Sequence, residues 1–308
     1  MLALDPGGRG IRAFSRPGAA RDAARALRRA RRVLITTGFT VADGMPETDG
    51  PPGAAVLGRA LRRLGARVCY VTDPVTVPLL GATLSALGEP REIETYPEGD
   101  GAARAVLARE RPTHLVAIER PSRSRSGDYL SARGESVAAW NRPLDELFVC
   151  SGVREAGSHR GWPERGAAWR RRAPERGATR RGRATTIGVG DGGNEIGMGN
   201  VRAKLVRQGA LLARIASVVR VDHLVVAGTS NWGAYGIVAA LGLLAGQDLL
   251  HTGALERRLV EACVEAGAFD GVTRRGEPTV DGLPLDVHAA VVELLRHASG
   301  AGRTPANR

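Results

Sequence analysis

Residues 33–73 have the sequence VLITTGFTVADGMPETDGPPGAAVLGRALRRLGARVCYVTD, which reads as a strand, a loop, a helix and a second strand. Apolar, β-branched runs typical of buried strands open the segment at 33–39 and close it at 67–73. Between them, apolar residues at helical spacing predict a helix over roughly 54–64, which Gly65 ends. A strand, a helix and a strand in this order indicate neighbouring strands of a parallel sheet.

The same alternation continues along the rest of the chain. Alternating strands and helices are typical of a largely parallel sheet that helices cover on both faces. We therefore predict an α/β fold whose site lies at the carboxyl ends of the strands, where such sheets bind ligands. The further predicted strands are 91–96, 114–120, 185–190 and 223–229, and the further predicted helices are 77–87, 101–110, 143–150 and one that begins near Trp232.

Three segments lie outside this alternating pattern. Residues 18–32 predict a lead-in helix with a basic face, so that 1–32 form a basic amino-terminal segment before an α/β domain over 33–300. The stretch 151–183 is rich in Arg, Gly and Ala and has no apolar periodicity, which predicts a low-complexity insertion within that domain. Residues 301–308 are expected to form a short tail.

The chain has 308 residues and a net charge of +12, but this charge is concentrated in two segments. Residues 1–32 and 151–183 each carry about +7, which leaves the rest of the chain slightly acidic. A nucleic-acid site would need a basic folded face with aromatic side chains that stack on bases. Aromatic residues make up only 4% of the chain, so we expect no nucleic-acid partner.

The sequence also bears on membrane association and compartment. Its longest apolar run, at 236–246, falls well short of the ~20 residues that a membrane span needs, so we expect no membrane partner. The cysteines, Cys69, Cys150 and Cys263, are scattered singly, and the amino terminus lacks the pattern of a secretory signal. These features predict a cytoplasmic protein, and no feature of the sequence indicates an oligomeric state.

The loop at 188–200, GVGDGGNEIGMGN, combines many glycines with three oxygen-bearing side chains. Glycines permit backbone conformations and close approaches that a Cβ forbids. Asp191, Asn194 and Glu195 lie among them, directly after a predicted buried strand. Such a loop suits a hard cation or a small polar ligand. The alternative is a glycine-rich turn whose acids cap the next helix.

The loop at 47–53, ETDGPPG, presents two carboxylates before a predicted helix. Glu47 and Asp49 are two residues apart, and two prolines restrict the conformation of the loop that carries them. The start of the following helix offers free N–H groups and a partial positive charge. These acids could form a ligand site or could simply cap that helix.

The loop at 229–236, TSNWGAYG, lies between a predicted strand and a predicted apolar helix. Thr229, Ser230, Asn231 and Gly233 bring hydroxyls, an amide and exposed N–H groups to the helix start. This combination can hold a carboxylate or a phosphate. The same residues could equally act as the N-cap of the helix, and one arrangement can serve both purposes.

Two further charged residues follow the predicted strand at 114–120. Glu119 stands at the strand end, where a carboxylate can act as a general base or as a metal ligand. Arg133, beside Gly134, could bind a substrate carboxylate through two parallel hydrogen bonds. Either residue could instead form an ordinary ion pair.

Four motifs, taken together and in this order, resemble the D-glutamate cyclase family. They are ETDGPPG at 47–53, GDGGNEIGMGN at 190–200, AGTSNWGAYG at 227–236 and DGVTRRGEPTVDGLPLDVH at 270–288. More narrowly, they are similar to the carboxy-terminal domain of the animal mitochondrial enzyme, which also occurs as stand-alone prokaryotic proteins. The resemblance implies a hydro-lyase that interconverts D-glutamate and 5-oxo-D-proline.

That implied reaction needs attack of an amine on a carboxylate, which is a poor electrophile. A bound Mg²⁺ or Mn²⁺ would polarise the carboxylate, and hard oxygen ligands favour such cations. The substrate would be a small amino acid. The expected metal ligands are Asp49, Asp191, Asn194 and Glu195, the expected proton acceptors are Glu47 and Glu119, and the expected substrate-binding residues are Arg133, Gly192, Gly193, Thr229, Ser230, Asn231 and Gly233.

Two other classes of function remain open at this point. A metal-dependent hydrolase or phosphatase could use the same acidic loops on a different substrate, and it would act on phosphate esters but not on D-glutamate. A non-catalytic protein could use the site to bind an amino acid, and it would show saturable binding without turnover.

Overall fold

The computed structural model describes residues 2–5, 8–152 and 183–300. Most of the predicted insertion at 151–183 and the whole of the predicted tail at 301–308 lie outside the described residues.

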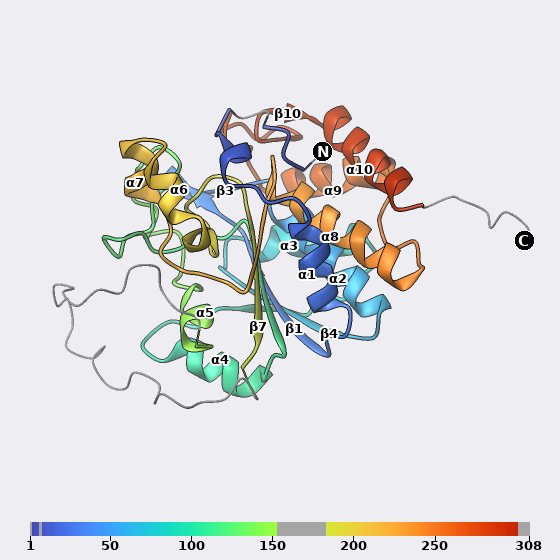
Figure 1. Ribbon diagram of the computed structural model, residues 1–308, viewed down its shortest axis with the longest axis horizontal. Coiled ribbons are helices and arrows are strands. Elements are labelled where there is room, and N and C mark those ends of the chain that lie inside the picture. The colour runs from blue at the N-terminus through green and yellow to red at the C-terminus, as the bar shows by residue number, and fades with distance from the viewer. Residues whose placement is uncertain (1, 6–7, 153–182, 301–308) are drawn as a thin grey trace, which may run out of the picture.

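A central sheet of six strands has the order β5-β4-β1-β6-β7-β8 (Figure 1). Every neighbouring pair in this sheet is parallel, which confirms the predicted α/β fold with a largely parallel sheet. The strands are β1 (Arg32–Thr37), β4 (Arg67–Thr72), β5 (Ile93–Thr95), β6 (His114–Ile118), β7 (Thr185–Gly190) and β8 (His223–Val226).

Helices cover both faces of the sheet (Figure 1). One face carries α1 (Ala19–Leu27), α2 (Pro51–Arg63), α3 (Val77–Ala86), α8 (Ser230–Ala245), α9 (Gly253–Glu265) and α10 (Leu285–Ala298). The other face carries α4 (Ala102–Glu110) and α5 (Glu146–Cys150), while α6 (Arg202–Val206) and α7 (Ala210–Ile215) pack with the amino-terminal residues.

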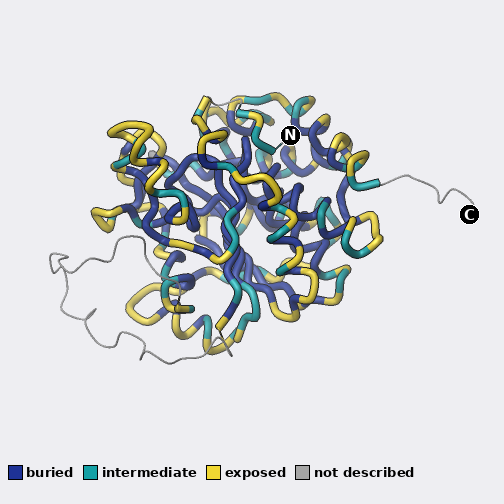
Figure 2. Tube along the Cα trace, viewed as in Figure 1, coloured by how far each residue is buried: buried dark blue, intermediate teal, exposed yellow. Residues whose placement is uncertain are grey.

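The inner strands β1, β4, β6 and β7 are buried along most of their length, as Figure 2 shows for the centre of the molecule. In β1, Val33 and Ile35 contribute to the apolar cluster under α2 and α8, whereas Leu34 between them contributes to the cluster under α4 and α5. Successive side chains of a strand point to opposite faces, so a continuous apolar run serves two cores at once. This pattern explains why the run at 33–39 lacks polar alternation.

A carboxy-terminal segment crosses the ends of the strands and joins the loop before α2. Phe269 N–H donates to Pro46 O at 2.8 Å, and Thr48 N–H donates to Phe269 O at 2.8 Å. Beyond this junction lies a hairpin of β9 (Thr279–Val280) and β10 (Leu283–Pro284). The remaining short elements are η1 (Ile11–Ala13), β2 (Thr40–Val41), η2 (Ala42–Gly44), β3 (Met45–Pro46) and η3 (Met198–Asn200).

Several predicted boundaries differ from the structure, and three of these differences have an identifiable physical reason. Helix α2 begins at Pro51, because proline is well suited to the first helical position, where its missing N–H needs no partner. Strand β6 ends at Ile118, because Glu119 takes a left-handed conformation with φ 42°. The lead-in helix ends at Leu27, and Arg32, which was expected to be its last residue, instead begins β1.

Helix α1 packs through its alanines against the same core as α8. Its arginine-rich side stays exposed, as the spacing at 18–32 predicts. Among the described helices, none combines the length and the hydropathy that a membrane crossing would require.

Candidate functional site

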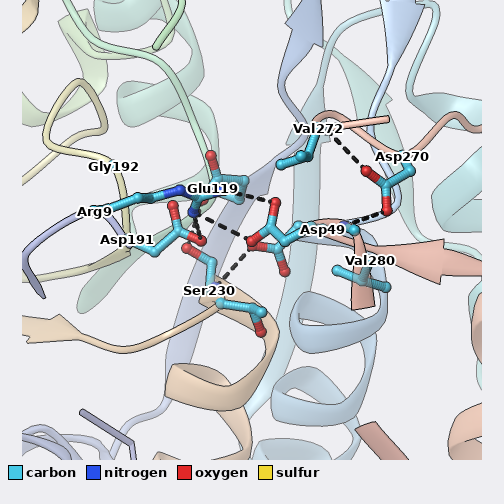
Figure 3. Close-up of polar contacts among 12 residues, drawn as sticks. Arg9, Asp49, Glu119, Asp191, Gly192, Ser230, Asp270, Val272 and Val280 are labelled. Carbon is cyan, nitrogen blue, oxygen red and sulfur yellow. Dashed lines mark hydrogen bonds and ion pairs between the residues drawn. The ribbon is translucent and has the colours of Figure 1, made fainter. Parts of the chain in front are cut away.

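Buried carboxylates gather at the carboxyl ends of β1, β6, β7 and β8, where the sequence predicts a site, and Figure 3 shows Asp49, Glu119 and Asp191 among them. They come from the loop before α2, from the ends of β6 and β7, and from the β9–β10 turn. None of them is more than 9% exposed. We call this group the carboxylate cluster, and its members are Glu47, Asp49, Glu119, Asp191 and Asp281.

Asp49 is anchored by the start of helix α8. Its Oδ2 accepts a hydrogen bond from Ser230 N–H at 2.7 Å, and its Oδ1 accepts one from Asn231 N–H at 2.8 Å. In return, Asn231 Oδ1 accepts hydrogen bonds from Gly50 N–H at 3.1 Å and Gly53 N–H at 2.8 Å. The starts of α2 and α8 therefore satisfy each other's free N–H groups and fix the Asp49 carboxylate between them.

Glu119 lies directly beside this junction. Ser230 Oγ donates a hydrogen bond to Glu119 Oε2 at 2.6 Å. A Cβ at Gly50 would lie 2.9 Å from Glu119 Cβ, so the loop passes over Glu119 only because residue 50 is glycine. The left-handed backbone at Glu119 is uncommon for a residue with a side chain, and it turns the carboxylate out of the strand direction into the cluster.

The glycine-rich loop is organised by Glu195, whose carboxylate accepts three backbone hydrogen bonds. Its Oε1 accepts from Asp191 N–H at 3.1 Å and from Gly192 N–H at 2.6 Å, and its Oε2 accepts from Gly193 N–H at 2.7 Å. Asn194 Nδ2 donates to Leu130 O at 2.7 Å. The loop thus folds around Glu195 and presents the Asp191 side chain to the cluster.

Two residues of the site carried no sequence prediction, Arg9 and Asp281. Arg9 Nη1 lies 2.6 Å from Asp191 Oδ2, and Arg9 Nη2 lies 2.9 Å from Asp281 Oδ1. Asp281 lies in the β9–β10 turn with φ 55° and is followed by Gly282. An Asp-Gly pair is typical of a hairpin turn, and it is the local sequence signal that could have predicted this turn. Arg9 differs from its eight neighbouring arginines over 1–32 only in having glycines on both sides.

The loop that carries Asp281 is held by Asp270, which the structure buries completely. Asp270 Oδ1 accepts hydrogen bonds from Val272 N–H at 2.8 Å and Thr273 N–H at 2.9 Å. Its Oδ2 accepts from Thr279 Oγ1 and from Gly282 N–H, both at 2.7 Å. All of these donors come from residues 272–282, so Asp270 shapes the loop.

Burial is the main cause of the shifted acidities in the cluster. It raises the pKa of Asp49 to about 8, with a further contribution from Asp281, against the hydrogen bonds from Asn231 and Ser230. Burial, followed by the neighbouring carboxylates, also raises the pKa values of Glu47 and Glu119. Several carboxylates facing one guanidinium require protons or a further cation, since uncompensated buried charge is costly.

The cluster fits a divalent cation of the hard type. Asp49, Asp191 and Asp281 each offer a carboxylate oxygen within 4.8 Å of the others, and Glu119, Asp191 and Glu195 do the same. Asp191 Oδ2 is buried and accepts no hydrogen bond, although Arg9 forms an ion pair with it. Clustered carboxylate oxygens are the ligands that Mg²⁺, Mn²⁺ and Ca²⁺ prefer.

The structure brings some of the expected site residues together and leaves others at the edge. Of the expected metal ligands, Asp49, Asp191 and Glu195 belong to these groups. Asn194 is buried in the same loop, and its role as a ligand stays a prediction. Arg133 is exposed, and its Nη2 donates to Val272 O at 3.3 Å rather than contacting a carboxylate of the cluster.

The other expected substrate-binding residues have structural contacts of their own. Thr229 Oγ1 caps α8 by accepting a hydrogen bond from Trp232 N–H at 3.2 Å. A Cβ at Gly233 would lie 2.5 Å from Val189 Cγ1, so this glycine lets α8 approach β7. Gly192 and Gly193 donate their N–H groups to Glu195. A role for any of these residues in binding substrate stays a prediction.

Comparisons with known proteins identify the family. The family profile described as "D-glutamate cyclase-like, C-terminal" matches residues 1–157 and 176–296. The human protein "D-glutamate cyclase, mitochondrial" is 31% identical over 96% of this chain and 50% of its own length, so the chain spans about half of that relative.

Among solved structures, an exopolyphosphatase-related protein from Bacteroides fragilis has a TM-score of 0.42 at 7% identity, covering 96% of this chain and 63% of its own. A similarity at that level carries no argument about fold or function. The profile match and the human relative both cover most of the chain, and the profile match includes every residue of the carboxylate cluster. The chain therefore belongs to the family described as "D-glutamate cyclase-like, C-terminal".

Proposed function

We propose that this protein is a hydro-lyase that interconverts D-glutamate and 5-oxo-D-proline with the help of a divalent cation. The observation that carries the proposal is the 31% identity to the human D-glutamate cyclase over 96% of this chain. Because the chain spans about half of that relative, the activity of the whole relative is assigned to this chain as a proposal. The buried carboxylate cluster supports it independently, because the reaction needs proton transfer and charge stabilisation at one place.

The reaction forms one bond and breaks another. The α-nitrogen of D-glutamate attacks the carbon of the γ-carboxylate, so that a C–N bond forms and a C–O bond breaks. The α-ammonium group gives up two protons, and the departing oxygen takes both of them to leave as water. A site for this reaction must therefore move protons over a short distance from nitrogen to oxygen.

Glu47 and Glu119 are suited to this transfer. Burial raises the pKa of both carboxyls well above the usual range, so that each, once ionised, is a stronger base than an ordinary glutamate. Ser230 Oγ, hydrogen-bonded to Glu119 Oε2, fixes the orientation of one of them. We assign the proton acceptor to one of these two residues.

Asp49, Asp191 and Asp281 would hold the cation, because their carboxylate oxygens lie within 4.8 Å of one another and Asp191 Oδ2 lacks a hydrogen bond. A Mg²⁺ or Mn²⁺ ion held by these residues would supply Lewis-acid polarisation and charge stabilisation. The protein itself supplies the rigid arrangement, since the start of α8 fixes Asp49 and Glu195 fixes the loop of Asp191. We further propose a cytoplasmic location, in which Cys69, Cys150 and Cys263 remain free thiols.

The test is to incubate the purified protein with D-glutamate and, separately, with 5-oxo-D-proline, in Mn²⁺, Mg²⁺ or EDTA. Both compounds are followed by chiral chromatography, with the L forms as matched substrates. The expected result is interconversion of the D forms that EDTA abolishes and either metal restores. Failure of a folded, metal-supplied protein to interconvert the D forms would contradict the proposal, and hydrolysis of phosphate esters alone would assign the site to a hydrolase.

A further inference from the structure

The described residues among 2–15, here called the N-terminal arm, are fastened beside the carboxylate cluster. Gly228 N–H donates to Leu2 O at 2.9 Å, next to the start of α8. The Asp5 carboxylate accepts hydrogen bonds from Arg9 N–H at 2.9 Å and Gly10 N–H at 2.7 Å. Ile11, completely buried, packs with the residues around α6 and β8. These contacts fix the backbone at the point where Arg9 projects into the site.

Arg9 uses only part of its hydrogen-bonding capacity on the protein. The edge formed by Nη1 and Nη2 contacts Asp281: Nη1 donates to Oδ2 at 3.2 Å, and Nη2 lies 2.9 Å from Oδ1. Arg9 Nη1 also lies 2.6 Å from Asp191 Oδ2, as an ion pair without a hydrogen bond. A guanidinium has five N–H donors in a rigid plane. The recorded contacts of Arg9 with these two acids, one hydrogen bond and two ion pairs, are made by Nη1 and Nη2, and Nε makes none of them.

The other edge of the Arg9 guanidinium carries two parallel N–H donors, one on Nε and one on Nη2. Within the described part of the chain, the structure records no acceptor for either of them. The Arg9 side chain keeps 21% exposure, while the side chains of Asp191 and Asp281 keep 4% each. Arg9 is therefore more exposed than the two acids that it contacts, and its Nε–Nη2 edge is a planar pair of donors with no acceptor among the described residues.

We propose that Arg9 binds a carboxylate of the substrate through its Nε–Nη2 edge while its other edge holds Asp281. Two parallel N–H donors match the two oxygens of a carboxylate, and such charge-assisted pairs are strong and directional. The substrate class is thus an amino acid with a free carboxylate beside the reacting groups. This inference rests on the proposed function for the identity of that amino acid, and it gives Arg9 the task that the sequence suggested for Arg133.

A positive charge is needed at this place for a simple reason. Each ionised carboxylate of the cluster would repel a dicarboxylate. Among the described residues, Arg9 is the basic side chain that forms ion pairs with the cluster, through Asp191 and Asp281. If Arg9 only balanced charge, any cation of similar reach would serve. If it binds a carboxylate by its edge, only a guanidinium will serve, because the lysine ammonium is a point charge without a planar pair of donors.

The experiment compares Arg9→Lys and Arg9→Gln with Arg12→Gln as the matched control. Arg12 lies on the same arm, and its Nε donates to Ala3 O at an exposed position. We measure KM and kcat for D-glutamate, the inhibition constant of glutarate, the affinity for Mn²⁺ and the melting temperature. The expected result is a ten- to hundredfold rise in KM and in the glutarate constant for both Arg9 variants, since each tenfold step corresponds to about 1.4 kcal/mol of lost binding. Arg12→Gln leaves all of these values unchanged.

The outcomes separate this inference from the proposed function. If the wild-type protein turns over D-glutamate and Arg9→Lys keeps its KM, Arg9 only balances charge and the inference is overturned. If the wild-type protein does not turn over D-glutamate, calorimetric binding of glutarate and 5-oxo-D-proline decides. If the wild type binds these ligands and Arg9→Lys does not, Arg9 contacts a carboxylate although the protein is not a cyclase. If Arg9→Lys binds them as tightly as the wild type, or if the wild type binds neither, the carboxylate contact is refuted.

Discussion

Replacement of Asn231 by alanine tests whether the junction of α2 and α8 holds the site together. Asn231 Oδ1 is the acceptor for the buried N–H groups of Gly50 at 3.1 Å and Gly53 at 2.8 Å. Alanine removes this acceptor and leaves both donors without a partner. An unsatisfied buried donor costs about 1–3 kcal/mol, so two of them predict a loss of roughly 2–6 kcal/mol in the free energy of unfolding.

The assay is denaturant unfolding of metal-free protein followed by circular dichroism, with the free energy extrapolated to water. Thr252→Ala is the matched control, because Thr252 Oγ1 caps α9 at an exposed position by accepting a hydrogen bond from Leu255 N–H at 3.2 Å. An exposed cap of this kind is worth about 1 kcal/mol. If Asn231→Ala costs no more than Thr252→Ala, the two helix starts do not depend on each other and the reasoning is refuted.

Three further predictions concern proton binding, metal binding and packing. The folded-state pKa of Asp49 lies at about 8, above its value of 3.8 in the unfolded chain, so the folded state binds the extra proton and the stability of metal-free protein falls as pH rises between these values. Denaturant unfolding at pH 5 and at pH 8 measures this loss of stability, and we expect Mn²⁺ to reverse it at pH 8. If Asp49→Asn shows the same dependence of unfolding free energy on pH as the wild type, Asp49 is not its source. His288 Nε2 donates to Val280 O at 3.2 Å and so helps to position the neighbouring Asp281. His288→Phe removes this donor and is expected to weaken Mn²⁺ binding about tenfold in a direct titration. Unchanged Mn²⁺ affinity would show that His288 does not position Asp281 for metal binding. Gly233→Ala places a Cβ 2.5 Å from Val189 Cγ1 of β7 and should lower the free energy of unfolding by about 1–3 kcal/mol in the same denaturation assay. Gly81→Ala in α3 is the matched control, because its Cβ would meet no atom nearer than 3.8 Å and should leave the stability unchanged or raise it.

The fold could be predicted from the sequence because local residue patterns are enough to indicate a parallel sheet. Apolar runs such as 33–39 bury both faces, and glycines such as Gly65 mark the helix ends. Boundaries were less accessible where a single residue departs from its pattern. Glu119 belongs by composition to the strand before it, yet its left-handed backbone is imposed by the contacts with the Gly50 loop and Ser230, which come from distant parts of the chain.

The acids of the site were accessible where they follow a strand or precede a helix. Asp49 and Asp191 occupy such positions, and the structure brings both into the cluster. Arg9 and Asp281 were not accessible, because each reaches the cluster through tertiary packing of a segment that reads as peripheral. The basic amino terminus looks like a solvated charged surface until its fastening beside β8 is known.

The most direct test of this account is turnover of D-glutamate by Asp191→Asn, with Mn²⁺ binding measured on the same sample. Asp191 belongs to both groups of clustered carboxylate oxygens, and Asp286→Asn is the control because its side chain is 82% exposed on α10. The account predicts that Asp191→Asn stays folded, loses Mn²⁺ binding and loses metal-dependent formation of 5-oxo-D-proline, while Asp286→Asn keeps both. Wild-type turnover and Mn²⁺ affinity in Asp191→Asn would place the chemistry outside the carboxylate cluster and contradict the account.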